Sequence, residues 1–158
     1  MITARLKLYF DLYSSSHQTR GNQITHVIGI PFILISVFGL LSDLMLETPF
    51  LTYSSYFRLD AGTALILISL PFYLYLDWQI TLPYALALMG LYFLGRTLPT
   101  PICWTLFILG WILQGIGHAK YEKKSPAFFQ NLIHLGIGPL WIFSKLVGYS
   151  KNVDGAST

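Results

Sequence analysis

Residues 114–139 read QGIGHAKYEKKSPAFFQNLIHLGIGP, a partly polar stretch between two apolar runs. Pro126 disfavours helix at the residue before it, so the chain is predicted to turn there. His118 and His134 each lie eight residues from Pro126. If the two flanks are antiparallel helices, both imidazoles lie at the same depth, roughly 12 Å from the turn. Gln114, His118 and Glu122 are spaced by four, so they share one helix face.

The composition indicates an integral membrane protein of one domain, residues 1–158. The chain is 54% hydrophobic and only 11% charged, whereas about 25% of residues are charged in a typical soluble domain. Several segments are apolar on all sides, which excludes a soluble amphipathic bundle. The net charge of +3 is not gathered into a basic patch with interleaved aromatic residues. We therefore expect the lipid bilayer as a partner and no nucleic acid.

The pattern of apolar runs predicts an all-α bundle of four to five transmembrane helices. Residues 1–22 are expected to form a short interfacial segment with an amphipathic helix on the membrane surface. Asn22 is the predicted cap of the first span, just after a break at Gly21. A tight turn is predicted at 77–79, and the sequence leaves open whether the last span crosses or bends back at 138–139. The predicted spans are residues 24–46, 61–76, 80–94, 102–117 and 127–147.

Basic residues predict the orientation of the spans. They gather before the first span and after the fourth, which the positive-inside rule assigns to the cytoplasm. Four crossings between the two groups agree with that assignment. It also puts all four histidines at the cytoplasmic face, near one another. The basic residues concerned are Arg5, Lys7, Arg20, Lys120, Lys123 and Lys124.

The histidines His17, His26, His118 and His134 are a candidate metal site, with four imidazole ligands or with three and an open position. On one continuous helix, nine residues would put His17 and His26 about 900° apart, on opposite faces. They can converge because Gly21 lets the chain bend. Imidazoles in this number suit iron, zinc, copper or nickel. The alternative is four interfacial or hydrogen-bonded histidines.

Nearby polar side chains are candidates for supporting this site. They are expected to orient the imidazoles through hydrogen bonds, with Glu122 accepting from a ring N–H. The alternative for the same residues is the capping of helix ends. The residues are Asn22, Gln114, Glu122 and Asn131.

Two motifs resemble those of a known family. One is Y-x(3)-H-x(4)-N-x(3)-H-x(2)-G-x-P from residue 13 to 31, and the other is Q-x(2)-G-H-x(3)-E-x(3)-P-A from 114 to 127, followed by Asn131 and Pro139. The chain resembles, over nearly its whole length, the small membrane-bound 2-hydroxy fatty acid dioxygenases known from fungal phytosphingosine breakdown. The resemblance implies an Fe(II)-dependent α-oxidation, in which a 2-hydroxy fatty acid and O2 give an acid one carbon shorter. It also implies essential histidines at matching positions; His134 lies outside the motifs, so its role as a ligand rests on the predicted hairpin.

A 2-hydroxy carboxylate can chelate iron through its hydroxyl and carboxylate oxygens, with its acyl chain among the spans. Arg20, Lys120 or Lys123 is expected to hold the carboxylate, with Gln114 and Asn131 as further substrate contacts. Glu122 and Asn22 are the candidate catalytic residues. A bacterial inner membrane is the expected location, or the endoplasmic reticulum in a eukaryote. Two alternatives stay open, a bis-histidine haem electron carrier and a non-catalytic membrane scaffold.

Overall fold

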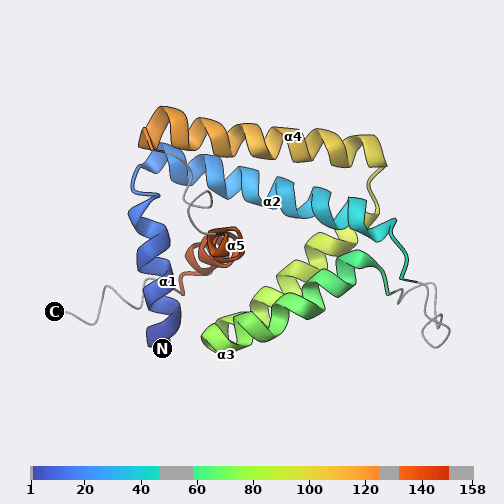
Figure 1. Cartoon of the computed structure of the whole chain (residues 1–158), viewed down its shortest axis with the longest axis horizontal. Helices are drawn as coiled ribbons and strands as arrows, with labels where there is room; N and C mark the ends of the chain where they lie inside the picture. Colours follow the sequence, from blue (N-terminus) through green and yellow to red (C-terminus); the bar gives the residue numbers. More distant parts are fainter. Residues whose placement is uncertain (1, 47–58, 125–131, 150–158) are drawn as a thin grey trace.

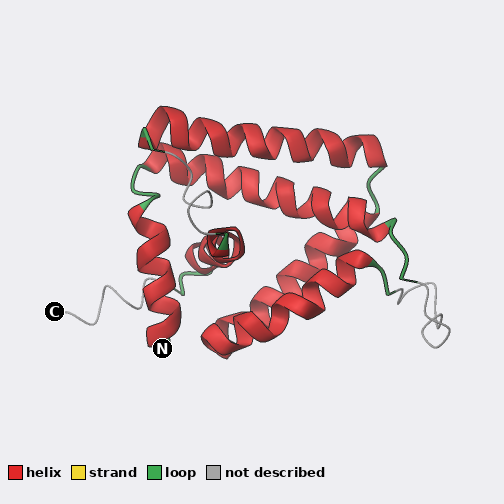
Figure 2. Cartoon of the chain, in the orientation of Figure 1, coloured by secondary structure: helices red, strands yellow, loops and turns green. Residues whose placement is uncertain are grey.

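The computed structural model describes residues 2–46, 59–124 and 132–149, and every regular element in these ranges is a helix (Figure 2). This confirms the predicted all-helical fold. In Figure 1, α2 and α4 lie side by side, α3 lies below one end of α2, and α5 is seen along its axis between α1 and α3. The elements are α1 (Ala4–Ser15), α2 (Arg20–Ser42), α3 (Ala61–Arg96), α4 (Thr100–Ile116), the π-helical η1 (Gly117–Glu122) and α5 (Ile133–Leu146).

Three helices are long and apolar enough to cross a membrane: α2, α3, and α4 continued through η1. The membrane character of the chain is therefore supported by the helices themselves. With 14 residues, α5 is about 21 Å long, which is shorter than the roughly 30 Å hydrocarbon core. The helix also continues through Pro139, so the bend at 138–139, one of the two alternatives that the sequence leaves open, is absent.

The chain reverses direction within α3, at the predicted turn. Asp77 has extended backbone angles (φ −167°, ψ 106°) inside an otherwise helical run. The two halves lie side by side (Figure 1). Their packing brings the rings of Tyr73 and Tyr84 to a centroid distance of 5.2 Å, and the hydroxyl of Tyr92 donates to the Asp60 carboxylate. The predicted helical hairpin is therefore present, while its two membrane crossings stay a prediction.

The hairpin tip holds the first helix in place. The backbone N–H of Thr3 donates to Asp77 Oδ2 over 2.9 Å, and the Tyr149 hydroxyl donates to the same oxygen over 3.1 Å. The amphipathic helix predicted at the N-terminus is α1, and its buried face presents Leu6, Phe10 and Tyr13 to the core. Helix α1 therefore packs against the bundle, and the bond from Thr3 to Asp77 fixes its position relative to the tip of the α3 hairpin. Its place on the membrane surface stays a prediction.

The start of α2 differs from the prediction. Thr19, not Asn22, is the cap, because its hydroxyl accepts from the Asn22 backbone N–H over 3.4 Å. The helix begins at Arg20 and includes Gly21. The bend between the first two histidines therefore lies in residues 16–19. Threonine and asparagine are both good caps, and the sequence offers both within four positions.

The predicted antiparallel pair on either side of Pro126 is wrong. Helix α4 lies in the plane of Figure 1, whereas α5 points along the line of sight. The reason is the apolar face of α5: Ile137, Leu140 and Trp141 are almost fully buried in one core with residues of α1, α2 and α3. Contacts with three other helices therefore determine the direction of α5.

Candidate metal centre

Three of the four histidines converge at one point. His17 follows α1, His26 lies in the second turn of α2, and His118 lies in η1. One ring nitrogen from each lies within 4.8 Å of the others. All three side chains are buried, with at most 4% of their surface exposed. The structure thus brings together His17, His26 and His118, which the sequence separates by up to 101 positions.

Backbone carbonyls determine the protonation of two of these rings. The Nδ1 atom of His17 lies 2.7 Å from the carbonyl oxygen of Tyr13, and that of His26 lies 2.9 Å from the carbonyl oxygen of Asn22. A carbonyl oxygen only accepts, so each neutral ring carries its proton on Nδ1 and a lone pair on Nε2. Both rings are therefore oriented as metal ligands usually are.

The two Nε2 atoms of His17 and His26 face each other at 3.1 Å. Two lone pairs cannot form a hydrogen bond, so this arrangement calls for a cation. Two nitrogens bound at about 2.1 Å to one ion, at an angle of about 90–110°, stand about 3.0–3.4 Å apart. The observed spacing fits that geometry. The residues present therefore fit a bound transition-metal ion.

His118 supplies the third imidazole. Its ring centroid lies 4.9 Å from that of His17 and 5.0 Å from that of His26, and its buried Nδ1 has no hydrogen-bond partner. A porphyrin between two axial imidazoles would force the rings much further apart. The arrangement therefore fits a compact metal ion with three imidazole ligands better than it fits a haem.

The π-helical segment η1 positions His118. Its i→i+5 bonding widens the end of α4, and the segment ends where Lys123 adopts a left-handed conformation (φ 55°). Gly117 allows η1 to touch α2, because a Cβ atom there would lie 2.3 Å from Thr25 Oγ1 and 2.4 Å from Asn22 Oδ1. The neighbouring His118 thereby approaches His26. π-helical turns often occur at functional sites.

Tyr13 holds His17 in two ways. Its carbonyl oxygen accepts the Nδ1 proton, and its ring stacks on the imidazole at a centroid distance of 3.9 Å and an angle of 7°. Burial lowers the pKa of His17 to about 4, so the ring is neutral near pH 7, as a metal ligand must be. Tyr13 is the first residue of the first motif, but the motif alone does not indicate this role. The four-residue spacing at the end of a helix could have indicated it.

His134 does not join the three-histidine group, so of the two predicted ligand sets the one with four imidazoles is not present, and the one with three imidazoles and an open position agrees with the structure. The four-ligand prediction assumed that α4 and α5 are antiparallel, and they are not. The His134 ring meets the Tyr13 ring edge-on at a centroid distance of 6.0 Å. Its buried Nδ1 has no hydrogen-bond partner, and burial lowers the pKa of the ring. His134 is thus a neutral imidazole beside the candidate centre.

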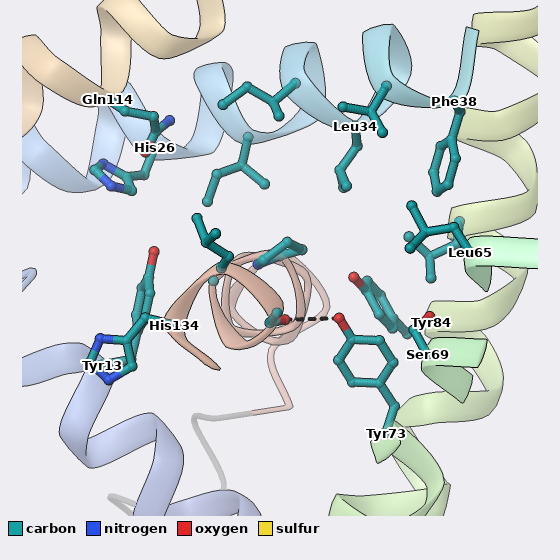
Figure 3. A pocket seen from close by; sticks show the side chains of 18 of the residues that line it. Tyr13, His26, Leu34, Phe38, Leu65, Ser69, Tyr73, Tyr84, Gln114 and His134 are labelled. Carbon is teal, nitrogen blue, oxygen red and sulfur yellow. Dashed lines mark hydrogen bonds between the residues drawn. The ribbon is translucent and has the colours of Figure 1, made fainter. Parts of the chain in front are cut away.

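A cavity of about 460 Å³ adjoins the histidines, a size within the usual range for small-molecule sites. His17, His26, His118 and His134 all line it. The remainder of the wall is mostly apolar and comes from all five α-helices, with Tyr13 as the contribution of α1. Figure 3 shows Tyr13, His26, Gln114 and His134 around one end, and Phe38, Leu65, Tyr73 and Tyr84 toward the other.

The predicted polar partners fall into two groups. Gln114 lines the cavity with only 6% of its surface exposed, and its Nε2 donor has no partner. Glu122 instead caps α2: its Oε1 accepts from the Thr19 backbone N–H over 2.8 Å and from Asn22 Nδ2 over 3.2 Å. The expected bond from Glu122 to a histidine is replaced by the backbone carbonyls described above.

The predicted cations do not reach the cavity. Arg20, Lys120 and Lys123 are exposed, and none of them is among the residues that line it. The Lys120 ammonium instead lies 5.6 Å from the centre of the Tyr121 ring. All three cations lie near helix ends, where long basic side chains extend outward. The fourth predicted substrate contact, Asn131, lies outside the described residues.

Comparison with known proteins supports the resemblance seen in the two motifs. Residues 3–150 match the family described as 2-hydroxy-palmitic acid dioxygenase Mpo1-like. The 2-hydroxy-palmitic acid dioxygenase MPO1 of Saccharomyces cerevisiae is 40% identical over 43 residues. Those residues are 27% of this chain and 25% of the yeast protein, so the match spans about a quarter of each. No solved structure matches the chain.

Proposed function

Because the chain belongs to the Mpo1-like family of 2-hydroxy-palmitic acid dioxygenases, we propose that it is an Fe(II)-dependent dioxygenase of 2-hydroxy fatty acids. In the proposed reaction the bond between C1 and C2 breaks, and C1 leaves as CO2. The former C2 becomes the carboxyl carbon of an acid one carbon shorter. O2 is the oxidant, and water is the other product, so the atoms balance as 2-hydroxy acid plus O2 to shortened acid, CO2 and water.

The observation that carries the proposal is the 3.1 Å approach of two unprotonated nitrogens, His17 Nε2 and His26 Nε2. With His118, they offer three neutral nitrogen donors in a buried site. Iron is among the metals that imidazole ligands suit. Three protein ligands leave positions for a substrate, and bound iron would supply the redox chemistry that activates O2.

In this proposal, different parts of the cavity wall bind the acyl chain and the head group of the substrate. The acyl chain fits the apolar portion of the wall, because binding there buries no polar protein group without a hydrogen-bond partner. The head group fits the histidine end, where Gln114 Nε2 and His134 Nδ1 lack hydrogen-bond partners. We assign to Gln114 the donation of an amide N–H to the carboxylate, and to His134 a second contact with the same head group. Neutral donors thereby replace the cations expected from the sequence.

Asn22 and Glu122 act through position rather than on the substrate. The Asn22 carbonyl oxygen keeps the proton of His26 on Nδ1. Glu122 holds the first turn of α2 through Thr19 and Asn22. Since His26 lies one turn after Asn22, the capping interaction is transmitted to a metal ligand. The two predicted catalytic residues thus become positioning residues in this proposal.

The test uses full-length protein purified in detergent and loaded anaerobically with Fe(II). Addition of a long-chain 2-hydroxy acid and air should consume O2 and yield the acid one carbon shorter, as measured by mass spectrometry. His26→Ala should lose both iron and turnover, whereas Leu86→Ala, at a site with 76% of its surface exposed, should keep both. Iron-loaded protein that turns over no 2-hydroxy acid would contradict the proposal.

We further propose that the chain crosses a bacterial inner membrane four times, with the histidines at the cytoplasmic face. The turn at Asp77 supports this, because it lies next to Thr3 and Tyr149, as two crossings within α3 require. Reporter fusions after residues 98 and 124 should report opposite sides of the membrane. The same side for both would contradict the topology.

A further inference from the structure

The cavity follows one face of α2. His26, Ile30, Leu34 and Phe38 all line it, and they are spaced by four, so they share that face. His26 lies at the metal end and Phe38 at the other (Figure 3). Phe38 follows His26 by twelve positions, which corresponds to roughly 18 Å along the helix axis.

The far end of the cavity has mostly buried walls, whereas two leucines that line the cavity are partly exposed. Phe38, Tyr84 and Leu88 expose 2%, 3% and 4% of their surfaces. Leu65 of α3, which lies near Phe38 in Figure 3, and Leu135 of α5, next to His134, also line the cavity but expose 43% and 46%. A ligand can therefore enter past these leucines, with the buried side chains of Phe38, Tyr84 and Leu88 ahead of its tail.

The far wall is firmly held. The Phe38 ring packs edge-on against Tyr92 at a centroid distance of 6.2 Å. Beside it, the Tyr73 hydroxyl donates to the carbonyl oxygen of Gly136 over 2.9 Å, the bond drawn in Figure 3. That bond joins α3 to α5, so the wall is anchored to two elements besides α2. We expect such a wall to move little when a longer ligand binds, because close-packed interiors are hard to deform.

From this geometry we infer that Phe38, Tyr84 and Leu88 form an end wall that sets the acyl chain length the protein accepts. An extended chain with C–C bonds of about 1.52 Å and angles of about 111° advances about 1.25 Å per carbon. The distance of roughly 18 Å from His26 to Phe38 therefore holds about 14 carbons beyond the metal site. The inference rests on the proposed function for the identity of the head group, but the wall acts on the tail alone.

The test changes the wall in two directions. Phe38→Ala removes a ring from the wall, and Leu88→Phe adds one. Affinities for saturated 2-hydroxy acids and for plain fatty acids of increasing length are measured by displacement of a fluorescent fatty acid. Phe93→Ala and Leu86→Phe are the matched controls, since neither residue lines the cavity and they expose 46% and 76% of their surfaces. Turnover of the same 2-hydroxy acids is measured separately.

Phe38→Ala should move the preferred length to longer acids, and Leu88→Phe should move it to shorter ones. For acids near the limit, the affinity should change by about tenfold per methylene. The controls should keep the wild-type profile. If both wall variants keep that profile, the inference is overturned even when turnover is normal. If the preferred lengths shift while no acid is turned over, the wall is supported and the proposed reaction is not.

Discussion

The Nε2 atoms of His17 and His26 lie 3.1 Å apart, and each ring keeps its proton on the opposite nitrogen. Without a cation, two lone pairs face each other in a buried site, so metal binding should stabilise the fold. At a free Fe(II) concentration of about 100 times Kd, the gain is about 2.7 kcal/mol. We expect thermal unfolding of chelator-treated protein to shift upward with Fe(II) but not with Mg(II), which prefers oxygen ligands. His17→Ala should lose most of the shift; an equal shift in this variant would place the metal elsewhere.

Gly117→Ala should damage the metal centre, since its Cβ would lie 2.3 Å from Thr25 Oγ1 and force η1 away from α2. Gly115→Ala is the matched control, because nothing lies within 4 Å of a Cβ atom there. Iron per mole of purified protein should fall about tenfold or more in the first variant, as for other changes that displace ligands. It should stay at the wild-type level in the second. Equal iron contents would show that the close approach at Gly117 is unnecessary.

His134→Ala should retain iron, because His134 lies outside the three-histidine group. It should raise the KM for 2-hydroxy acids if the imidazole contacts the head group. Loss of one hydrogen bond to a charged group corresponds to about 1.5–3 kcal/mol, or roughly 10–150-fold in affinity. Iron analysis and steady-state kinetics on the same preparation separate the two roles. If His134→Ala loses as much iron as His118→Ala, His134 is a metal ligand and the prediction is wrong.

Glu122→Ala should lower the stability of the fold more than the metal content. The carboxylate holds Thr19 and Asn22 at the start of α2, and losing such a cap typically costs about 0.5–2 kcal/mol. A thermal melt of the chelator-treated protein should therefore fall by a few degrees, while iron per folded molecule stays near the wild-type level. A tenfold drop in iron affinity with an unchanged melt would instead support direct contact with a histidine ligand.

The sequence was sufficient to predict that His17, His26 and His118 could meet. Charge placement predicts one side of the membrane for their segments, and apolar runs long enough to span it predict four crossings between them. The turn at Asp77 was also visible, because a polar residue interrupted an apolar run. These features depend on local composition and on the bilayer, so one sequence reveals them.

The details that failed depend on contacts between distant segments. His134 was expected beside His118 by symmetry about Pro126, but the burial of Trp141 and Leu140 against other helices directs α5 elsewhere. The hydrogen-bond partner of Glu122 is a helix end about 100 positions away. Nothing in the local pattern around Glu122 distinguishes that partner from a histidine one turn away.

Leu65 and Leu135 line the cavity and are partly exposed, so we expect an acid to exchange with the bilayer there without turning over. The cavity runs parallel to α2. If α2 crosses the membrane, the neighbouring lipid tails are also parallel to it. We therefore expect a substrate to enter with its acyl chain parallel to α2, so that the chain stays in a hydrocarbon environment throughout. In the proposed reaction the product has lost the hydroxyl that makes a chelate, so we expect it to bind the metal end more weakly. It can leave by the same path, and product release needs no opening of the bundle.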